Sequence, residues 1–211
     1  MNSINKASIL SKALYVQDIS IYIEQEKEKL QKEILRRAIE ARIKEYGPNC
    51  DLNDLDVSSV TDMSSLFAWS EFNGDISNWD VSNVKDTGSM FYKSKFNGDI
   101  SRWNTSNVRN MRYMFGCSKF NEDISKWDVS NVENMSNMFC ESKFNGDISK
   151  WNVSRVRNMS YMFAHSDFEQ NLSNWTIVPG TLTVCMLQRD TPHDIPFPPR
   201  FRPKGLKRDA Y

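Results

Sequence analysis

The stretch from Ile76 to Phe96, ISNWDVSNVKDTGSMFYKSKF, returns whole or in part along most of the chain at a spacing of 24 residues. Phenylalanine, isoleucine and valine positions share this period, and tryptophan shows it most clearly. Self-similarity at a fixed period is typical of arrays in which each unit stacks on its neighbours. We therefore expect a continuous stack whose structural core contains the five periodic tryptophans: Trp79, Trp103, Trp127, Trp151 and Trp175.

The spacing of apolar residues within one repeat predicts the local structure. Offsets of 0, 3, 5 and 8 residues, as in Ile76, Trp79, Val81 and Val84, match a leucine-rich repeat. The apolar-polar-apolar alternation around Trp79 predicts a short parallel strand. The fold class predicted is therefore an α/β solenoid, a leucine-rich-repeat-like array of about five coils.

The remaining part of each repeat is predicted to return the chain to the next strand. Met111, Met114 and Phe115 have the spacing of a short helix or 3₁₀ turn. Asn-Gly pairs such as Asn97-Gly98 then predict a turn, since both residues tolerate positive φ. Each coil should thus combine one short strand with one short helical return.

Three regions divide the chain, at residues 1–50, 51–178 and 179–211. From about Ile19 to Tyr46 the pattern is that of an amphipathic helix, ended by Gly47-Pro48. Because a stack exposes its first apolar layer, we expect this helix to be an N-terminal cap; a coiled-coil dimer is the alternative. Residues 179–211 are predicted to supply a closing strand and then a Pro-rich basic tail.

Composition limits the function classes. The 27 basic and 27 acidic residues balance, so nothing attracts the chain to nucleic acid or to an anionic membrane in general. The four cysteines lack CxxC spacing, which favours a reducing compartment. No signal-peptide pattern and no membrane span is present in the sequence, so we expect a cytoplasmic protein.

The repeat WDVSNVxxMxxMFxxSxFNGDIS, in several copies between Asp51 and Ile177, resembles the BspA-like leucine-rich-repeat proteins. Such proteins are known from bacterial surfaces, some protists and large DNA viruses. The resemblance implies a right-handed solenoid used for adhesion or protein–protein contact, and it brings no catalytic residue. Association with a virion is one setting that it implies.

Acidic residues recur at one position of the repeat, and stacking would place them ~4.8 Å apart. A calcium ladder or a pair of hydrolase carboxylates is one interpretation, and capping of the adjacent turn is the other, which we favour. No catalytic or nucleotide-binding motif accompanies them. We therefore expect no enzyme activity, no metal and no cofactor. The residues are Asp75, Asp99, Asp123 and Asp147.

Outward-facing positions of the predicted strand are the main candidate binding site. They should lie on a concave face, as a basic row beside an acidic and amide row. Tyrosines on the helical side form a second candidate surface, and the tail a third, by peptide-like docking. The rows are Arg102, Lys126 and Lys150 beside Asp80, Asn104, Asp128 and Asn152; the tyrosines are Tyr92, Tyr113 and Tyr161; the tail residues are Phe197, Arg200, Phe201 and Arg202.

These features predict a non-enzymatic scaffold for protein–protein interaction, with another protein or assembly as its partner. An accessory role in a larger assembly such as a virion is the specific version. The alternatives are a carbohydrate-active solenoid, which needs converging carboxylates, and a nucleic-acid-binding solenoid, which would lose affinity steeply with salt.

Overall fold

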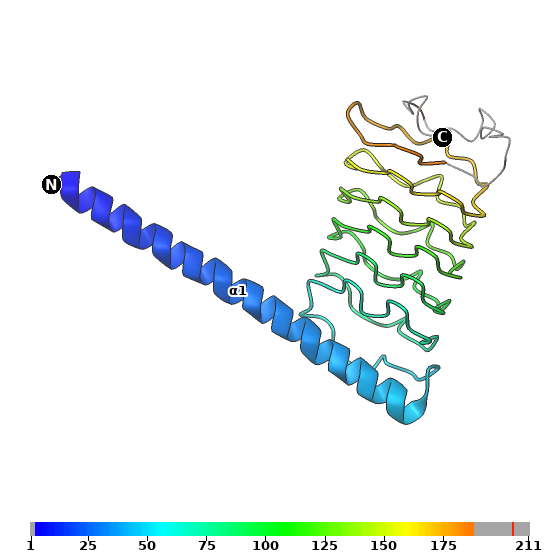
Figure 1. The fold of residues 1–211 in the computed structure, drawn as a ribbon, viewed down its shortest axis with the longest axis horizontal. Helices are drawn as coiled ribbons and strands as arrows, with labels where there is room; N and C mark the ends of the chain where they lie inside the picture. Colours follow the sequence, from blue (N-terminus) through cyan, green and yellow to red (C-terminus); the bar gives the residue numbers. More distant parts are fainter. Residues whose placement is uncertain (1–2, 188–203, 205–211) are drawn as a thin grey trace.

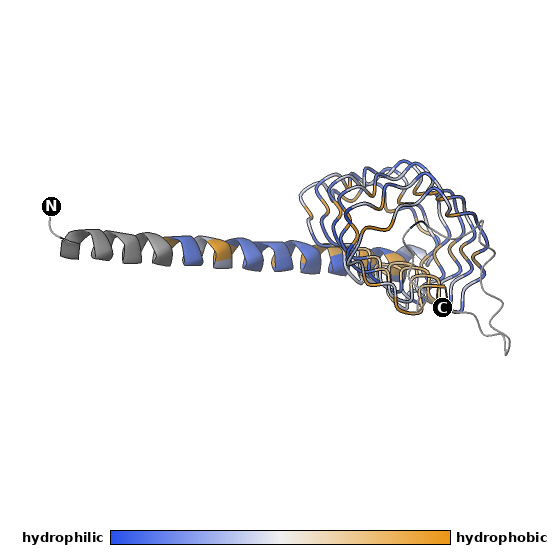
Figure 2. Cartoon of the chain, turned by 90° about the horizontal axis from the view of Figure 1, so that it is seen from above, coloured by the Kyte–Doolittle hydropathy of each residue, from blue (hydrophilic) through white to orange (hydrophobic). Residues whose placement is uncertain are grey.

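The computed structural model describes residues 3–187 and residue 204. Its single helix within these residues, α1 (Ser3–Tyr46), is long and straight, and its first part extends away from the rest of the molecule (Figure 1). The chain then winds through stacked coils as far as Leu187. Seen along the stack, successive coils superimpose and enclose a common interior (Figure 2).

The second part of α1 packs on the first coil. Leu35 and Ile39 are buried there. Polar contacts flank them, including an ion pair of 2.9 Å between Lys32 Nζ and Asp62 Oδ2. The helix ends at Tyr46, and the next residue, Gly47, has the φ of 86° and the N–H bond to the Ile43 carbonyl (2.9 Å) of a left-handed residue that follows a helix. The helix therefore covers the apolar side chains that the first coil would otherwise expose.

Backbone pairing holds successive coils in a register of 24 residues. Isolated parallel bridges join Asp62 to Asp86 and continue coil by coil to Leu182. Around each bridge, alternate N–H groups donate to the coil that follows. The N–H of Met63 thus donates to the Asp86 carbonyl at 2.8 Å, and the N–H of Phe67 to the Met90 carbonyl at 2.9 Å. Just before each bridge a bond runs the other way, as the N–H of Lys85 donates to the Thr61 carbonyl of the preceding coil at 2.7 Å, so neighbouring coils exchange donors in both directions.

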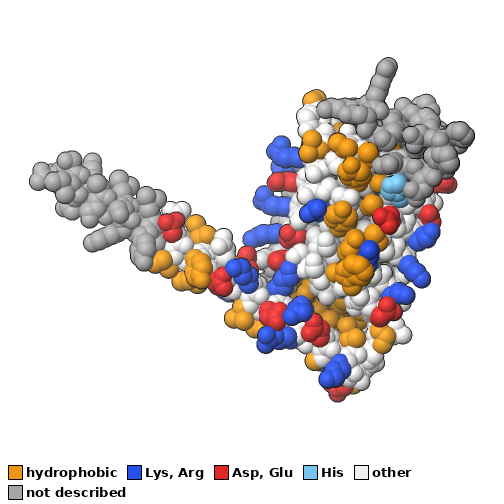
Figure 3. Space-filling model, in the orientation of Figure 1, with side chains coloured by type: hydrophobic (Ala, Val, Ile, Leu, Met, Phe, Trp, Pro, Cys, Tyr) orange, Lys and Arg blue, Asp and Glu red, His pale blue; other side chains and the backbone are white. Residues whose placement is uncertain are grey.

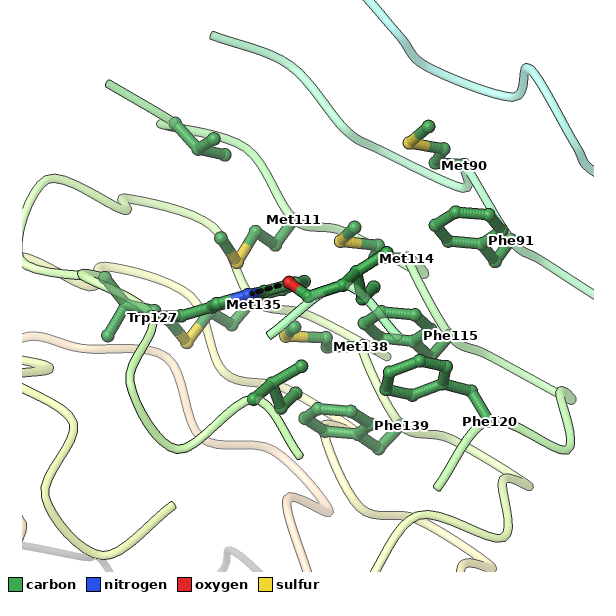
Figure 4. Packing of buried hydrophobic residues seen from close by; sticks show 14 of the residues in the cluster. Met90, Phe91, Met111, Met114, Phe115, Phe120, Trp127, Met135, Met138 and Phe139 are labelled. Carbon is green, nitrogen blue, oxygen red and sulfur yellow. Dashed lines mark hydrogen bonds between the residues drawn. The ribbon is translucent and has the colours of Figure 1, made fainter. Parts of the chain in front are cut away.

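The five tryptophans of the 24-residue period lie inside this stack. Each indole N–H donates to a backbone carbonyl of the preceding coil, as Trp127 does to Ile100 at 3.0 Å (Figure 4). Neighbouring indoles are nearly parallel, with 6.4 Å between the ring centroids of Trp103 and Trp127. Buried indoles need a partner for the N–H, and here the same bond also joins two coils.

Two columns of phenylalanine complete the core. Phe91 stacks on Phe115 of the next coil at 5.6 Å between ring centroids, and within its own coil it contacts Phe96 at 4.4 Å. Methionines fill the space between these rings and the indoles, as Met111 and Met135 do (Figure 4). Aromatic contact therefore runs both along the stack and across each coil.

The predicted α/β solenoid with short parallel strands is wrong. The described residues contain no strand: the parallel pairing between coils forms isolated single-residue bridges and does not extend into a sheet. At the predicted strand, the N–H of Trp79 turns back to the Ile76 carbonyl (3.2 Å) and the N–H of Ser82 bonds Oδ1 of Asp80 (3.0 Å). Because local turns use these N–H donors, successive coils form no ladder of backbone hydrogen bonds along the segment that carries the periodic tryptophans.

The predicted short helical return is also absent. Residues at every fourth position of this segment have positive φ, including Tyr113 (56°) and Cys117 (53°). A left-handed residue interrupts a right-handed helix, and the segment becomes a series of turns. This geometry directs alternate N–H groups toward the next coil instead of along a helix axis.

The glycines of the Asn-Gly pairs are needed for a different reason from the one predicted. Positive φ among the described glycines occurs at Gly47 and Gly180, not at Gly74 or Gly98. A Cβ at Gly74 would lie 1.8 Å from the Cys50 carbonyl oxygen. Glycine therefore allows close approach of two backbone segments at the junction of α1 with the coils.

Residues 179–187, where a closing strand was expected, continue the stack. Leu182 forms a parallel bridge with Asn158, and the N–H of Phe163 donates to the Met186 carbonyl at 2.9 Å. Lys204 then pairs with the last coil, donating to the Trp175 carbonyl at 2.9 Å. The 24-residue register thus extends beyond the last periodic tryptophan.

Candidate binding surfaces

The predicted basic row lies on the outside of the stack. The 24-residue register places Arg102, Lys126 and Lys150 one above another, and all three are exposed. Each precedes a buried tryptophan, which is why the side chain points away from the core. Charged side chains form columns along the edges of the stack (Figure 3). A regularly spaced basic row is therefore available to solvent.

The acidic and amide row two residues further on is exposed as well, but its side chains also hold the backbone. Oδ1 of each accepts the N–H of the serine two residues later, as Asp128 does from Ser130 at 2.9 Å. The hydroxyl and N–H of Ser130 lower the pKa of the Asp128 carboxyl. The row comprises Asp80, Asn104, Asp128 and Asn152.

The other acidic row caps turns. Oδ1 of Asp99 accepts the N–H of Ser101 at 2.9 Å, and Asn171 accepts that of Ser173 at 2.8 Å in the same position. This backbone bond is the main cause of a lowered pKa at the Asp99 carboxyl. A neutral amide serves equally well at Asn171, so the position requires an acceptor, not a charge. Within residues 3–187 and 204, no group of three or more acidic, histidine or cysteine side chains is arranged to hold a metal ion.

An aromatic cluster lies on the return segments of three successive coils. Trp69 is 68% exposed, and its ring meets Tyr92 edge-on with 5.8 Å between centroids. Tyr92 meets Tyr113 in the same way at 5.5 Å. Two cations lie over these rings: Lys93 Nζ is 4.3 Å from the Trp69 centroid, and Arg112 Cζ is 5.1 Å from that of Tyr113. We call these five residues the aromatic face.

The aromatic face contains a shallow hollow of about 280 Å³, lined by Ser89, Tyr92, Arg112 and Tyr113. Partial burial raises the pKa of the Tyr92 phenol, with the neighbouring Cys117 thiol as the next cause. The phenol is therefore a neutral hydrogen-bond donor at physiological pH. Hydrophobic side chains gather in a column between the charged edges of the stack (Figure 3).

Sequence reasoning identified two members of this face, Tyr92 and Tyr113, and missed Trp69. The missed signal was present, since Trp69 is the one tryptophan of six that does not follow the 24-residue period. Tyr161, the third predicted tyrosine, lies two coils beyond Tyr113 in the same row and is 40% exposed. The tail residues Phe197, Arg200, Phe201 and Arg202 lie outside the described residues.

Comparison with known proteins identifies a repeat family. The family model described as "Mycoplasma protein of unknown function, DUF285" matches residues 43–143 and 116–193, which together span most of the chain. The chain therefore belongs to this family. No curated protein and no solved structure matches it. Within the described residues, no helix is both long enough and apolar enough to cross a membrane.

Proposed function

We propose that this chain is a non-enzymatic protein-binding module, and that the aromatic face is its main contact surface. The observation that carries the proposal is the exposed arrangement of Trp69, Tyr92 and Tyr113 beneath two cations. Tryptophan, tyrosine and arginine are the residues most enriched at interface hot spots. An indole that is 68% exposed, as Trp69 is, contributes little to the packing of the stack, so its role is more readily explained by contact with a partner.

The rest of the molecule supplies a rigid support for this contact. The return segments that carry the aromatic face are bonded to the neighbouring coils at every second residue. A partner therefore meets side chains that are already ordered, which lowers the entropic cost of binding. The basic row of Arg102, Lys126 and Lys150 provides a second, polar contact surface in the proposal.

The resemblance of the repeat to BspA-like leucine-rich-repeat proteins, which is more specific than the family match, supports the same function. These proteins act in adhesion and protein–protein contact. On this resemblance we propose a place in a larger assembly such as a virion. The stacked architecture suits such a role because the surface can be extended by coils without altering the core.

Quantitative affinity capture from extracts of the native source tests the proposal. Trp69→Ala with Tyr113→Ala should lose the proteins that the wild type retains, while thermal unfolding stays close to that of the wild type. Charge reversal of Arg102, Lys126 and Lys150 is the comparison variant and should weaken capture less. Equal retention by the wild type and the aromatic variant would contradict the proposed surface.

The two alternative functions give different results in parallel assays. A glycan array that retains the wild type and loses the Trp69→Ala variant would replace the proposal with carbohydrate binding, since aromatic rings also pack against sugars. Binding to single- or double-stranded nucleic acid that falls steeply with salt would assign the basic row to phosphate contacts instead.

A further inference from the structure

The aromatic face lies within a positively charged part of the stack. The return segments of the two coils whose tyrosines line the hollow, residues 85–95 and 109–119, contain six cations and a single acid, Asp86. In the corresponding segments of the coils on either side, residues 61–71 and 133–143, acids outnumber cations. The positive charge is therefore confined to two coils. We call the six exposed cations the cationic patch: Lys85, Lys93, Lys95, Arg109, Arg112 and Lys119.

The acid within these two segments is used by the backbone and by an amide of the next coil. Oδ1 of Asp86 accepts the N–H of Gly88 at 2.7 Å. Nδ2 of Asn110 donates to both oxygens of the same carboxylate, at 3.1 and 3.0 Å. The Asp86 carboxylate therefore holds its own turn and the neighbouring coil together and is not directed at a cation of the patch.

Acids at the margins pair with half of the cationic patch. These contacts are exposed and between 3.5 and 3.9 Å long, so each contributes little. Lys93, Arg112 and Lys119 make no ion pair in the part of the chain that the structure describes. Glu141 lies two coils beyond Lys93 in the 24-residue register, with Cys117 between them. The marginal pairs are Lys85 with Glu28, Lys95 with Glu71, and Arg109 with Glu133.

The rings limit what can bind among these cations. Single-stranded nucleic acid binds by stacking successive bases on aromatic faces beside a basic groove. Here Lys93 lies over the Trp69 ring and Arg112 over the Tyr113 ring, so a cation already covers one face of each. Trp69 meets Tyr92, and Tyr92 meets Tyr113, at interplanar angles of 80° and 82°, so the three rings form no series of parallel platforms. The arrangement favours a ligand that carries carboxylates over one that stacks bases.

The hollow suits one such carboxylate. A guanidinium such as that of Arg112 can hold a carboxylate through two parallel N–H bonds. The Ser89 hydroxyl and the Tyr92 phenol also line the hollow, and both can donate. Trp69 presents an exposed indole beside them, against which an apolar side chain can pack. Charged and apolar contacts are thus available to one short segment of a partner.

We propose that the segment bound by the aromatic face is an acidic peptide. One carboxylate enters the hollow and meets Arg112, further carboxylates meet Lys93 and Lys119, and an apolar side chain packs on Trp69. This inference rests on the proposed function and specifies the chemistry of the partner.

Fluorescence anisotropy of the full chain with a defined probe tests the proposal. The probe is a labelled short peptide with glutamates on both sides of a central leucine, and its matched counterpart has glutamine in place of every glutamate. The wild type should bind the glutamate probe about tenfold more tightly or better. Raising the salt from about 0.05 to 0.3 M should weaken binding of the glutamate probe only.

Variants of one arginine locate the contact. Arg112→Gln should weaken binding of the glutamate probe by about fivefold or more. Arg112→Lys should lie between, because it keeps the charge and loses the fork of N–H donors. Arg157→Gln is the matched control, at an exposed arginine of a later return segment outside the cationic patch, and should bind as the wild type does. Thermal unfolding should be unchanged in all three variants, which separates loss of binding from loss of the fold.

Three kinds of result would overturn the proposal. Equal binding of the two probes, or binding of neither up to about 1 mM, would exclude an acidic peptide. Tighter binding of a labelled oligodeoxythymidine than of the glutamate probe would assign the cations to phosphate. Equal weakening by Arg112→Gln and Arg157→Gln would place the carboxylates elsewhere.

The proposed function fails separately from this inference. If affinity capture still depends on Trp69 while the glutamate probe does not bind, the aromatic face remains the contact surface and only the acidic class of partner is wrong. If the glutamate probe binds and Arg112→Gln weakens it while capture is independent of Trp69, the site is confirmed for acidic peptides and the captured proteins use another surface.

Discussion

The coil stack and α1 obtain their stability in different ways. Every tryptophan of the 24-residue period is at most 5% exposed and is bonded to the coil before it. Among the described side chains of α1, by contrast, only Leu35 and Ile39 are buried. The stack therefore supplies its own core, whereas the helix is packed only around Leu35 and Ile39, where it meets the first coil. Substitutions in the two regions should differ accordingly.

The largest loss of stability is expected within the stack. Trp127→Ala removes a buried indole, its contact with Trp103 and its bond to the Ile100 carbonyl. We expect the free energy of unfolding to fall by about 3–5 kcal/mol. Urea unfolding followed by circular dichroism measures this change. A loss below about 1 kcal/mol would show that neighbouring coils close the cavity or do not depend on the indole.

A smaller loss is expected where α1 meets the stack. Ile39→Ala should cost about 2–3 kcal/mol, near the lower end for a buried isoleucine, because the helix can detach while the coils persist. Ile23→Ala, at a residue of the same helix that is 59% exposed, is the control. Hydrogen exchange should then show faster exchange in α1 than in the coils. Equal acceleration in both regions would mean that they unfold together.

The junction between the two regions offers a backbone test. Gly74→Ala places a Cβ against the carbonyl oxygen of Cys50, and backbone must move to accept it. We expect a loss of about 1–3 kcal/mol. Gly98→Ala should cost less, since its nearest neighbour is the ring of Phe96. Thermal unfolding of the two variants measures both losses. A larger loss for Gly98→Ala than for Gly74→Ala would contradict the close-approach explanation.

The smallest effect is expected from pH. In the folded chain the backbone N–H of Ser101 lowers the pKa of Asp99 below its ordinary value of 3.8, and the side chain and N–H of Ser125 do the same for Asp123. Stability from these carboxylates is therefore present above that value and is lost as pH falls through the lowered pKa. The melting temperature should decline modestly below about pH 4, since the groups are exposed.

A neutral replacement isolates this contribution. Asp99→Asn, Asp123→Asn and Asp147→Asn together should flatten the decline, because Asn171 makes the same turn bond without a charge. Melting temperatures of the wild type and the triple variant between pH 2 and 6 provide the comparison. An identical decline in both proteins would assign acid sensitivity to other carboxyl groups.

Sequence reasoning located the core but not the backbone pairing. The period identified Trp103 and Trp127 as stacked residues because burial follows from apolar composition at a fixed spacing. It also predicted strands and helical returns, and these are absent. The reason lies in residues such as Tyr113, whose positive φ nothing in its side chain favours. Contacts with neighbouring coils impose that conformation, so a local propensity does not predict it.

The sequence predicted one of the candidate surfaces, the basic row, but not the aromatic face. The exposed positions of Arg102 and Lys126 follow from their place beside a buried tryptophan, which the sequence specifies. The aromatic face does not follow, because Trp69, Tyr92 and Tyr113 occupy different positions of three different repeats. They meet only when turns bring one residue of each coil to the same surface.

The sequence alone determined the 24-residue repeat and the side chains that it buries. A single repeat cannot bury its own apolar side chains, so the repeats must stack on one another to form a core. The tertiary structure decided which N–H groups join the coils, which side of α1 remains exposed, and where Trp69 finds its neighbours. These features depend on contacts between residues about 24 or more positions apart, and such contacts are set by the packing of whole coils.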